Sequence, residues 1–99
     1  MPNGDKRGRG MTGKRISAEQ LKVMAVFTGE PQEWLDSNEV ERKTGLPGST
    51  VRHFLFTFLR LGLLEHLEMH GGYRYRLSPE AKKQPYYERL QAAAAAMKQ

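Results

Sequence analysis

The chain has 99 residues, of which 38% are hydrophobic and 27% charged, which is enough for one domain with one modest core. Cysteine is absent, which excludes disulfides and cysteine zinc sites; no apolar run is long enough for a membrane span or a signal peptide, and we expect neither. We therefore expect a cytoplasmic protein, and we expect no cofactor. The formal net charge of +5 suggests a polyanionic partner.

The basic residues are unevenly distributed along the chain. Residues 1–15 hold five basic side chains and one acidic one among glycines, which predicts a disordered basic arm ending in Lys14 and Arg15. We therefore expect three parts: the arm, a folded domain over residues 16–84, and a C-terminal helix over residues 85–99.

Two helices are predicted first. Ser17 and Gln20 form a capping box before a segment, about residues 18–28, with apolar residues at helical spacing. Asp36 and Glu39 form the same signature before a second, shorter helix. A turn after that helix leads directly into a third, so the pair has the form of a helix-turn-helix unit.

The third helix is predicted to begin at Pro47 or Gly48 and to stop at Gly62. Its core face repeats at the i, i+3, i+4, i+7 spacing: Val51, Phe54, Leu55, Phe58 and Leu61. Polar side chains lie on its other face: Ser49, Arg52, His53 and Arg60.

Beyond this helix the apolar period changes from 3.6 to 2, which predicts a β-hairpin. We expect a three-residue loop over residues 70–72 rather than a two-residue one. That loop pairs Leu67 with Tyr75. It also pairs Met69 with Tyr73, so that the apolar side chains gather on one face.

A final helical region is predicted from Ser78, which caps, and Pro79, which opens the helix. Pro85 should end or kink it and start a new helix. The apolar seam of this helix consists of Tyr86, Tyr87, Leu90, Ala93, Ala94 and Met97. A helix this short needs a burial partner, either its own domain or a second subunit, and we favour dimerisation.

The segment "SNEVERKTGLPGSTVRHFLFTFLRLGLLEHLEMHGGYRYRLSPEA" resembles the winged helix-turn-helix domain of MarR-like and ArsR-like transcription regulators. The resemblance extends over about residues 17–81. It implies an α+β fold with a three-helix core, a β-hairpin wing and a C-terminal helix. It also implies that the protein binds double-stranded DNA and is not an enzyme.

By this resemblance, Ser49, Thr50, Arg52 and His53 enter the major groove, while Arg74 and Arg76 lie on the wing and follow the phosphates or the minor groove. Arg60 and the arm residues Lys14 and Arg15 are further candidates for DNA contact. The alternative for Arg52 and Arg60 is that they are ordinary solvated helix charges.

Three residues depart from the family pattern. Phe56 and Leu59 are apolar where the family usually has polar or charged residues, so a packed helix, a second subunit, a protein partner or a thymine methyl group is expected to cover them. Pro47 replaces the usual serine cap, which weakens the assignment of Ser49.

Two other chemistries are not expected. His66, Glu68 and His70 alternate along an exposed ribbon and do not form a metal site. Glu65 and Glu68 have no pocket or nucleophile beside them, so they do not form a catalytic carboxylate pair.

The function we expect is a homodimeric, nucleoid-associated repressor that occupies an operator. The alternative within the same fold is a plasmid or viral centromere-binding or replication-accessory protein. A third possibility is protein contact through Phe56 and Leu59 or through the C-terminal helix.

Overall fold

A computed structural model describes residues 16–97 of the chain. The elements are α2 (Ala18–Gly29), α3 (Ser37–Thr44), α4 (Gly48–Arg60), β2 (Leu64–Met69), β3 (Gly72–Leu77), a 3-10 turn (Ala81–Lys83) and α5 (Pro85–Met97). The predicted arm, with Lys14 and Arg15, lies outside the described residues, and so does the side chain of Met97. The α+β prediction is confirmed: α2, α3 and α4 are followed by a hairpin and a C-terminal helix.

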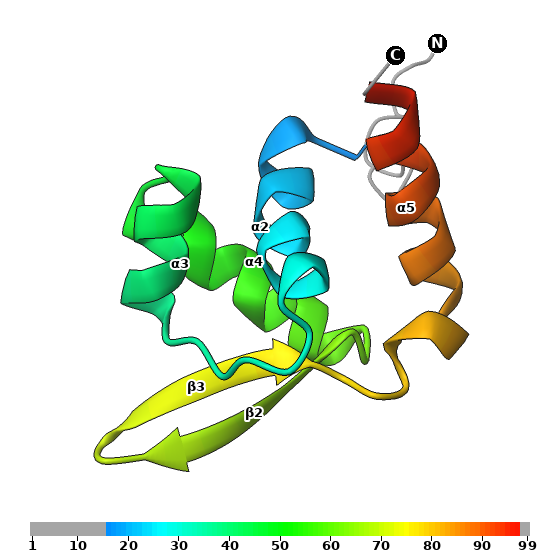
Figure 1. The fold of residues 1–99 in the computed structure, drawn as a ribbon. Coiled ribbons are helices and arrows are strands. Elements are labelled where there is room, and N and C mark those ends of the chain that lie inside the picture. The colour runs from blue at the N-terminus through cyan, green and yellow to red at the C-terminus, as the bar shows by residue number, and fades with distance from the viewer. Residues whose placement is uncertain (1–15, 98–99) are drawn as a thin grey trace, which may run out of the picture.

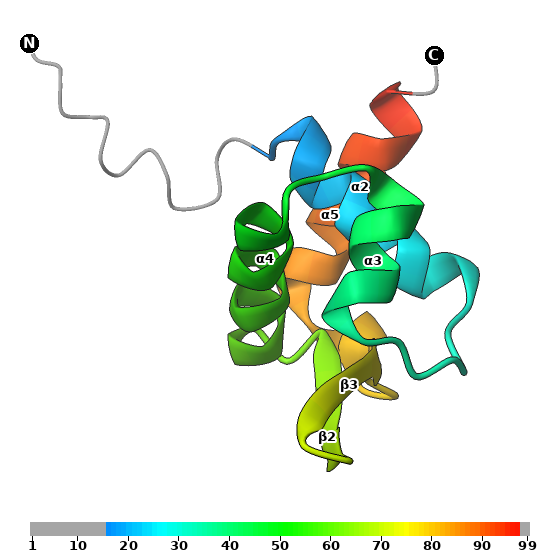
Figure 2. The same ribbon diagram turned by 90° about the vertical axis from the view of Figure 1, so that its left-hand side faces the viewer.

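The three core helices lie on one side of the hairpin. Helix α2 lies between α5 and the pair formed by α3 and α4, and the hairpin projects below them (Figure 1). Figure 2 shows α3 and α4 packed side by side in front of α2. This arrangement leaves one flank of α4 free of other helices.

Local capping explains why the first two helices begin where they do. The Ser17 hydroxyl accepts a hydrogen bond from the Gln20 N–H at 3.2 Å, and the Gln20 side chain accepts one from the Ser17 N–H. Asp36 and Glu39 make the same reciprocal pair at 2.8 Å. Helix α3 ends at Gly45 with φ of 75°, a conformation that costs glycine little. The predicted caps are confirmed.

The hydrophobic core is one cluster with buried residues from every element except β3, whose Tyr75 and Leu77 pack partly buried against it. Its buried members are Leu21, Val23, Met24, Phe27, Leu35, Val40, Val51, Leu55, Phe58, Leu63, Leu64, Ala81 and Leu90. Within the described residues no polar or charged side chain is buried. Because the core is entirely apolar, burial rather than internal ion pairing holds the helices together.

The hairpin register differs from the prediction by one residue. Leu67 lies opposite Arg74 and Met69 opposite Gly72, so the loop has two residues, His70 and Gly71. Both have positive φ, 48° and 79°, as a type I′ turn requires. The two-residue turn therefore decides the register, and the apolar side chains are divided between the two faces instead of gathering on one.

Replacing His70 by asparagine is expected to raise the free energy of unfolding by up to about 1 kcal/mol. The reason is that a non-glycine residue with positive φ is strained, and asparagine tolerates this conformation best at the first position of a type I′ turn. Urea unfolding followed by circular dichroism measures the change. His70→Val, in contrast, should destabilise the chain; equal stability of both variants would contradict the turn assignment.

The segment after β3 is simpler than predicted. The Ser78 hydroxyl accepts a hydrogen bond from the Glu80 N–H at 3.1 Å, but only a single 3-10 turn follows, not an α-helix. Gln84 has extended backbone angles, as expected before a proline, and Pro85 begins α5 as predicted.

The apolar seam of α5 packs onto its own domain. Leu90 is fully buried in the core, and the Gln20 side-chain amide donates a hydrogen bond to the Tyr86 hydroxyl at 2.8 Å. The other seam residues with described side chains are half-buried against the core: Tyr86, Tyr87, Ala93 and Ala94. We expected a second subunit to cover this seam; instead its central residue is covered by the same chain.

Candidate nucleic-acid interface

One face of α4 is exposed along its whole length. The exposed side chains recur three or four residues apart: Ser49, Arg52, His53, Phe56 and Arg60. We call this set the α4 stripe. Its members lie together because 3.6 residues complete one helical turn, while Val51, Leu55 and Phe58 on the opposite face are buried. The stripe unites five of the predicted site residues, whereas Thr50 lies beside it and is half-buried.

Side chains of α3 and α4 meet beside Gly48, the first residue of α4. Pro47 occupies the N-cap position without a side-chain hydrogen bond, as the sequence predicted. A Cβ atom on Gly48 would lie 2.7 Å from the Glu41 carboxylate and 3.1 Å from the Arg52 guanidinium. Both contacting groups are the ends of flexible side chains, so they could shift to admit a small side chain; the short distances show that the Glu41 carboxylate and the Arg52 guanidinium both lie beside Gly48, at the turn between α3 and α4.

The arginines of the α4 stripe make no close ion pair with a described carboxylate, although the Glu41 carboxylate lies near Arg52 at Gly48. Within residues 16–97 neither Arg52 nor Arg60 forms an ion pair with a carboxylate. The Arg60 guanidinium lies 5.5 Å from the centre of the Phe56 ring, and the His53 ring packs edge-on against Phe54. The stripe contains no acidic side chain, so it presents positive charge and hydrogen-bond donors at the protein surface.

The two wing arginines differ in their surroundings. Arg74 is half-exposed, and its guanidinium lies 3.9 Å from a Glu39 carboxylate oxygen that already caps α3. Arg76 donates two hydrogen bonds to Glu65, at 2.8 and 2.6 Å, and its guanidinium lies 4.3 Å from the Trp34 ring centre. Arg74 is therefore the freer of the two, and Arg76 ties the wing to the segment between α2 and α3.

Replacing Arg76 by alanine is expected to lower the free energy of unfolding by about 1 kcal/mol, because a half-exposed ion pair and a cation–π contact are lost together. Trp34 is the single tryptophan of the chain, so its emission should shift as well. Arg74→Ala serves as the control and should leave the free energy of unfolding and the tryptophan emission nearly unchanged. An unaltered emission spectrum in Arg76→Ala would contradict the contact.

Sequence reasoning did not find the contact between Arg76, Glu65 and Trp34. The ion pair could have been predicted from the correct register, which places Glu65 directly opposite Arg76 on the neighbouring strand. The position of Trp34 depends on a β-bridge between Leu35 and Tyr75, with hydrogen bonds of 2.9 and 2.8 Å, which no local pattern indicates.

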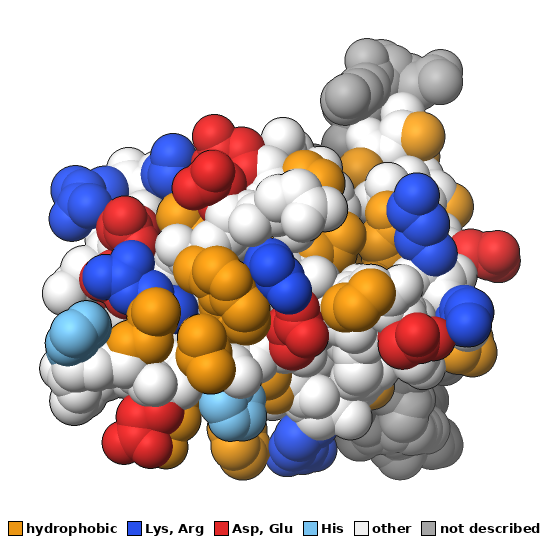
Figure 3. Space-filling model, turned by 60° about the horizontal axis from the view of Figure 1, so that its bottom comes forward, with side chains coloured by type: hydrophobic (Ala, Val, Ile, Leu, Met, Phe, Trp, Pro, Cys, Tyr) orange, Lys and Arg blue, Asp and Glu red, His pale blue; other side chains and the backbone are white. Residues whose placement is uncertain are grey.

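Figure 3 shows the underside of the molecule, where hydrophobic side chains lie among basic and acidic ones.

An apolar hollow separates α4 from the wing. Its volume is about 230 Å³, and it is lined by Phe56, Leu59, His66, Tyr73 and Tyr75. The His66 and Tyr73 rings pack at nearly a right angle, with 5.2 Å between ring centres. Burial, and to a lesser extent the neighbouring Tyr73, raise the pKa of Tyr75 above its ordinary value. Leu59 is half-buried against the core, which accounts for its apolar character.

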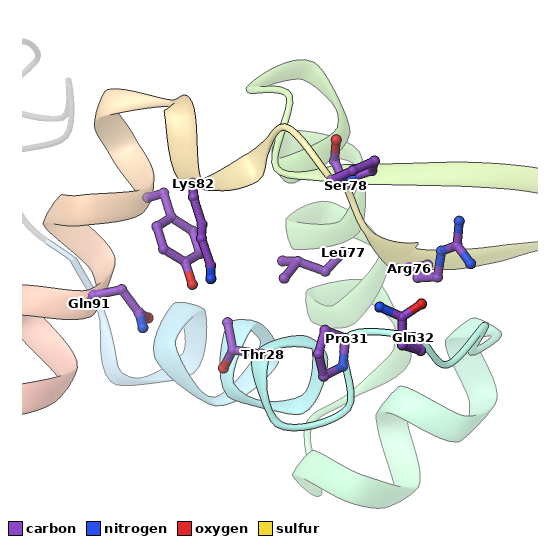
Figure 4. Close-up of a pocket in the computed structure, with 10 residues that line it drawn as sticks. Thr28, Pro31, Gln32, Arg76, Leu77, Ser78, Lys82 and Gln91 are labelled. Atoms are coloured by element: carbon purple, nitrogen blue, oxygen red, sulfur yellow. The ribbon is translucent and has the colours of Figure 1, made fainter.

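A second hollow, of about 570 Å³, lies between the end of α2, the end of β3 and α5. Figure 4 shows Thr28 and Pro31 on one side of this space and Lys82 and Gln91 on the other. Arg76 contributes to its rim but is already paired with Glu65. Lys82 is exposed and is the cation that remains for a ligand there.

The described residues form neither a metal site nor a membrane-spanning helix. Within residues 16–97 no three histidine, aspartate or glutamate side chains gather closely enough to hold a metal ion. In the same part of the chain no helix has the length and apolar character to cross a membrane.

Comparison with known proteins gives consistent results. Residues 21–68 match the model of the IclR helix-turn-helix domain. Comparison with curated protein sequences gives no match. Among solved structures, the PcaV transcriptional regulator of Streptomyces coelicolor superposes with a TM-score of 0.66 at 26% identity, over 92% of this chain and 64% of PcaV.

Two further structures are similar in fold. MepR, a transcription regulator of the Staphylococcus aureus multidrug efflux pump MepA, has a TM-score of 0.64 at 18% identity, over 91% of this chain and 66% of MepR. A possible transcriptional regulator from Methanosarcina mazei has a TM-score of 0.61 at 21% identity, over 83% and 72% of the two chains. The present chain spans about two thirds of the length of these proteins.

Proposed function

We propose that this chain, which is a winged helix-turn-helix DNA-binding domain of the transcription-regulator class, recognises one duplex sequence and represses transcription by occupying it. The observation that carries the proposal is the α4 stripe, which is exposed, basic and without a carboxylate. In this proposal Arg52 bonds the O6 and N7 atoms of guanine, and Ser49, Thr50 and His53 bond base edges or phosphates beside it. The proposal places the protein in the cytoplasm, on the nucleoid.

The wing and the basic arm complete the proposed interface. Arg74 is half-exposed with one long ion-pair contact, so it can exchange Glu39 for a phosphate. The basic arm, which includes Lys14 and Arg15, adds positive charge that attracts DNA of any base sequence. Phosphate contacts of this kind position the domain, while the base contacts of α4 specify the site.

We propose that the functional unit is a homodimer. A two-fold dimer presents two α4 helices about 34 Å apart, one helical turn of DNA, and so favours a palindromic operator. Because Leu90 is covered by its own domain, the partner contacts involve other surfaces than the centre of the α5 seam. Sedimentation equilibrium at micromolar concentration tests this: a single monomeric species, bound one per site to asymmetric DNA, would overturn the dimer.

The sequence-specific function is tested by selection from a pool of random DNA duplexes. Repeated binding and amplification should enrich one motif, and fluorescence anisotropy should then show that the motif binds at least about 1,000-fold more tightly than a scrambled duplex. A pool that stays random after many rounds would overturn the proposal. A scrambled duplex bound equally well would do the same.

The two alternative functions have less support. The similar structures named above are transcription regulators, which does not favour a centromere-binding or replication-accessory role. Cooperative spreading along repeated sites would be the mark of such a role. Contact with a protein through Phe56 and Leu59 is also not supported, since Leu59 already packs against the core of its own chain.

We also propose that the hollow beside Lys82 takes a small carboxylic acid that changes DNA affinity. Its volume of about 570 Å³ is in the range of small-molecule sites, and Lys82 provides the charge to hold an anion. PcaV has been solved with its natural ligand. Benzoate is a suitable probe: it should raise the thermal midpoint of the chain and not of Lys82→Ala, and an equal response from both proteins would overturn the site.

A further inference from the structure

Phe56 is the one apolar member of the α4 stripe and lies at its centre. At about 100° per residue, Arg52 falls on one side of Phe56 and His53 on the other. The Phe56 side chain is 59% exposed, although its neighbours Leu55 and Phe58 are buried. A large exposed aromatic ring in the middle of a polar, basic stripe leaves most of its surface free for an apolar contact with a partner.

The surroundings of Phe56 continue this apolar surface towards the wing. The hollow of about 230 Å³ beside it is lined by aliphatic and aromatic side chains and one histidine, with no lysine, arginine or carboxylate. Two arginines of the α4 stripe flank Phe56: the Arg60 guanidinium lies 5.5 Å from the Phe56 ring centre, and Arg52 is exposed one turn earlier on the same face. Such a surface, apolar at the centre and positive at the edges, is complementary to a base edge between two phosphate strands.

We infer that Phe56 is a specificity-determining residue that packs against the C5 methyl group of a thymine in the major groove. Thymine is the only one of the four bases with a methyl group on that edge; adenine, guanine and cytosine present polar atoms there. A phenyl ring cannot bond these polar atoms and would leave them without partners, which disfavours the other bases at this position. The inference rests on the proposed DNA-binding function and names one feature of the DNA sequence that it selects.

The test replaces each thymine of the selected duplex, one at a time, by deoxyuridine, which removes the methyl group and nothing else. Fluorescence anisotropy should show about a three- to fivefold weaker affinity at one thymine of each half-site, the effect of exposing one buried methyl group. In Phe56→Ala the same replacement should have no effect. Leu67→Ala is the matched control, because Leu67 is a similarly exposed apolar residue on the outer face of the wing, and it should keep the full sensitivity.

Each other result overturns the inference. If no thymine position is sensitive in the unchanged protein, or if Phe56→Ala keeps the sensitivity, Phe56 does not read the methyl group. If Phe56→Ala instead abolishes self-association or binding of a protein partner, the surface has another occupant. The selection experiment distinguishes failure of this inference from failure of the proposed function. An enriched motif without thymine sensitivity overturns only the inference on Phe56. A pool without any motif overturns both the inference and the proposed sequence-specific binding. Phe56→Leu, which keeps an apolar side chain, should keep part of the sensitivity and guards against misfolding of the alanine variant.

Discussion

Replacing Leu90 by alanine is expected to lower the free energy of unfolding by about 3 kcal/mol, within the 2–5 kcal/mol found for buried leucines. Leu90 is fully buried, and it is the residue through which α5 enters the common core. The change removes its methyl groups and leaves a cavity facing α2. Urea unfolding followed by far-ultraviolet circular dichroism measures the loss.

The matched control for Leu90 is Ala95→Ser, a change on the exposed face of the same helix that should cost at most about 0.5 kcal/mol. For the same reason, a chain that ends at Gln84 should be strongly destabilised rather than a folded monomer. Should Leu90→Ala instead unfold like the unchanged chain while a dimer dissociates, α5 would belong to a subunit interface and the packing described above would be wrong.

Replacing Arg52 by alanine is expected to lower the ratio of specific to non-specific DNA binding by about 1–3 kcal/mol, the value of one good bidentate contact with guanine. The guanidinium lies at the start of α4, on the exposed stripe, and no described carboxylate pairs with it. Affinity for scrambled DNA should fall only by the electrostatic contribution of one positive charge near the phosphates. Anisotropy titrations with the selected and the scrambled duplex give the ratio directly.

Arg89→Ala is the matched control for Arg52, because it removes the same charge from α5, where the guanidinium lies 5.2 Å from the Tyr86 ring centre. This variant should keep the ratio and lower both affinities slightly at most. If Arg52→Ala and Arg89→Ala behaved alike, the effect of Arg52 would be one of net charge, and its assignment to a base contact would fail.

The helices were predictable because their signals are local. Two helices are capped by hydrogen bonds between residues three apart in the sequence: Ser17 with Gln20, and Asp36 with Glu39. These local hydrogen bonds do not depend on the tertiary contacts of the helix. The exposed stripe of α4 follows from the same periodicity, since the positions not required by the core remain at the surface. This is why the polar candidate residues of α4, except Thr50, could be placed together from the sequence.

The hairpin register was predicted wrongly because two local rules disagreed. Gathering Leu67 and Tyr75 on one face favoured a three-residue loop, whereas His70 and Gly71 favour a two-residue turn. The turn prevailed, because Leu67 can remain 43% exposed at little cost. With this register Arg76 meets Glu65, so one of the two wing arginines is held within the protein.

The apolar seam of α5 shows a different limit of sequence reasoning. Periodicity shows that a helix face must be buried, but not by which surface, and a dimer partner and the same domain give the same pattern. Here the long-range contact between Gln20 and Tyr86, 66 residues apart, fixes α5 against α2. Contacts of this range are a property of the assembled core and have no local signal.

The central claim is that the α4 stripe lies in the major groove and reads bases there. Dimethyl sulfate probing of the selected duplex tests it most directly, because this reagent methylates guanine N7 in the major groove and adenine N3 in the minor groove. The account predicts that the protein protects guanine N7 within each half-site and that Arg52→Ala loses this protection at one guanine. Protection confined to adenine N3, or unchanged guanine protection in Arg52→Ala, would contradict it.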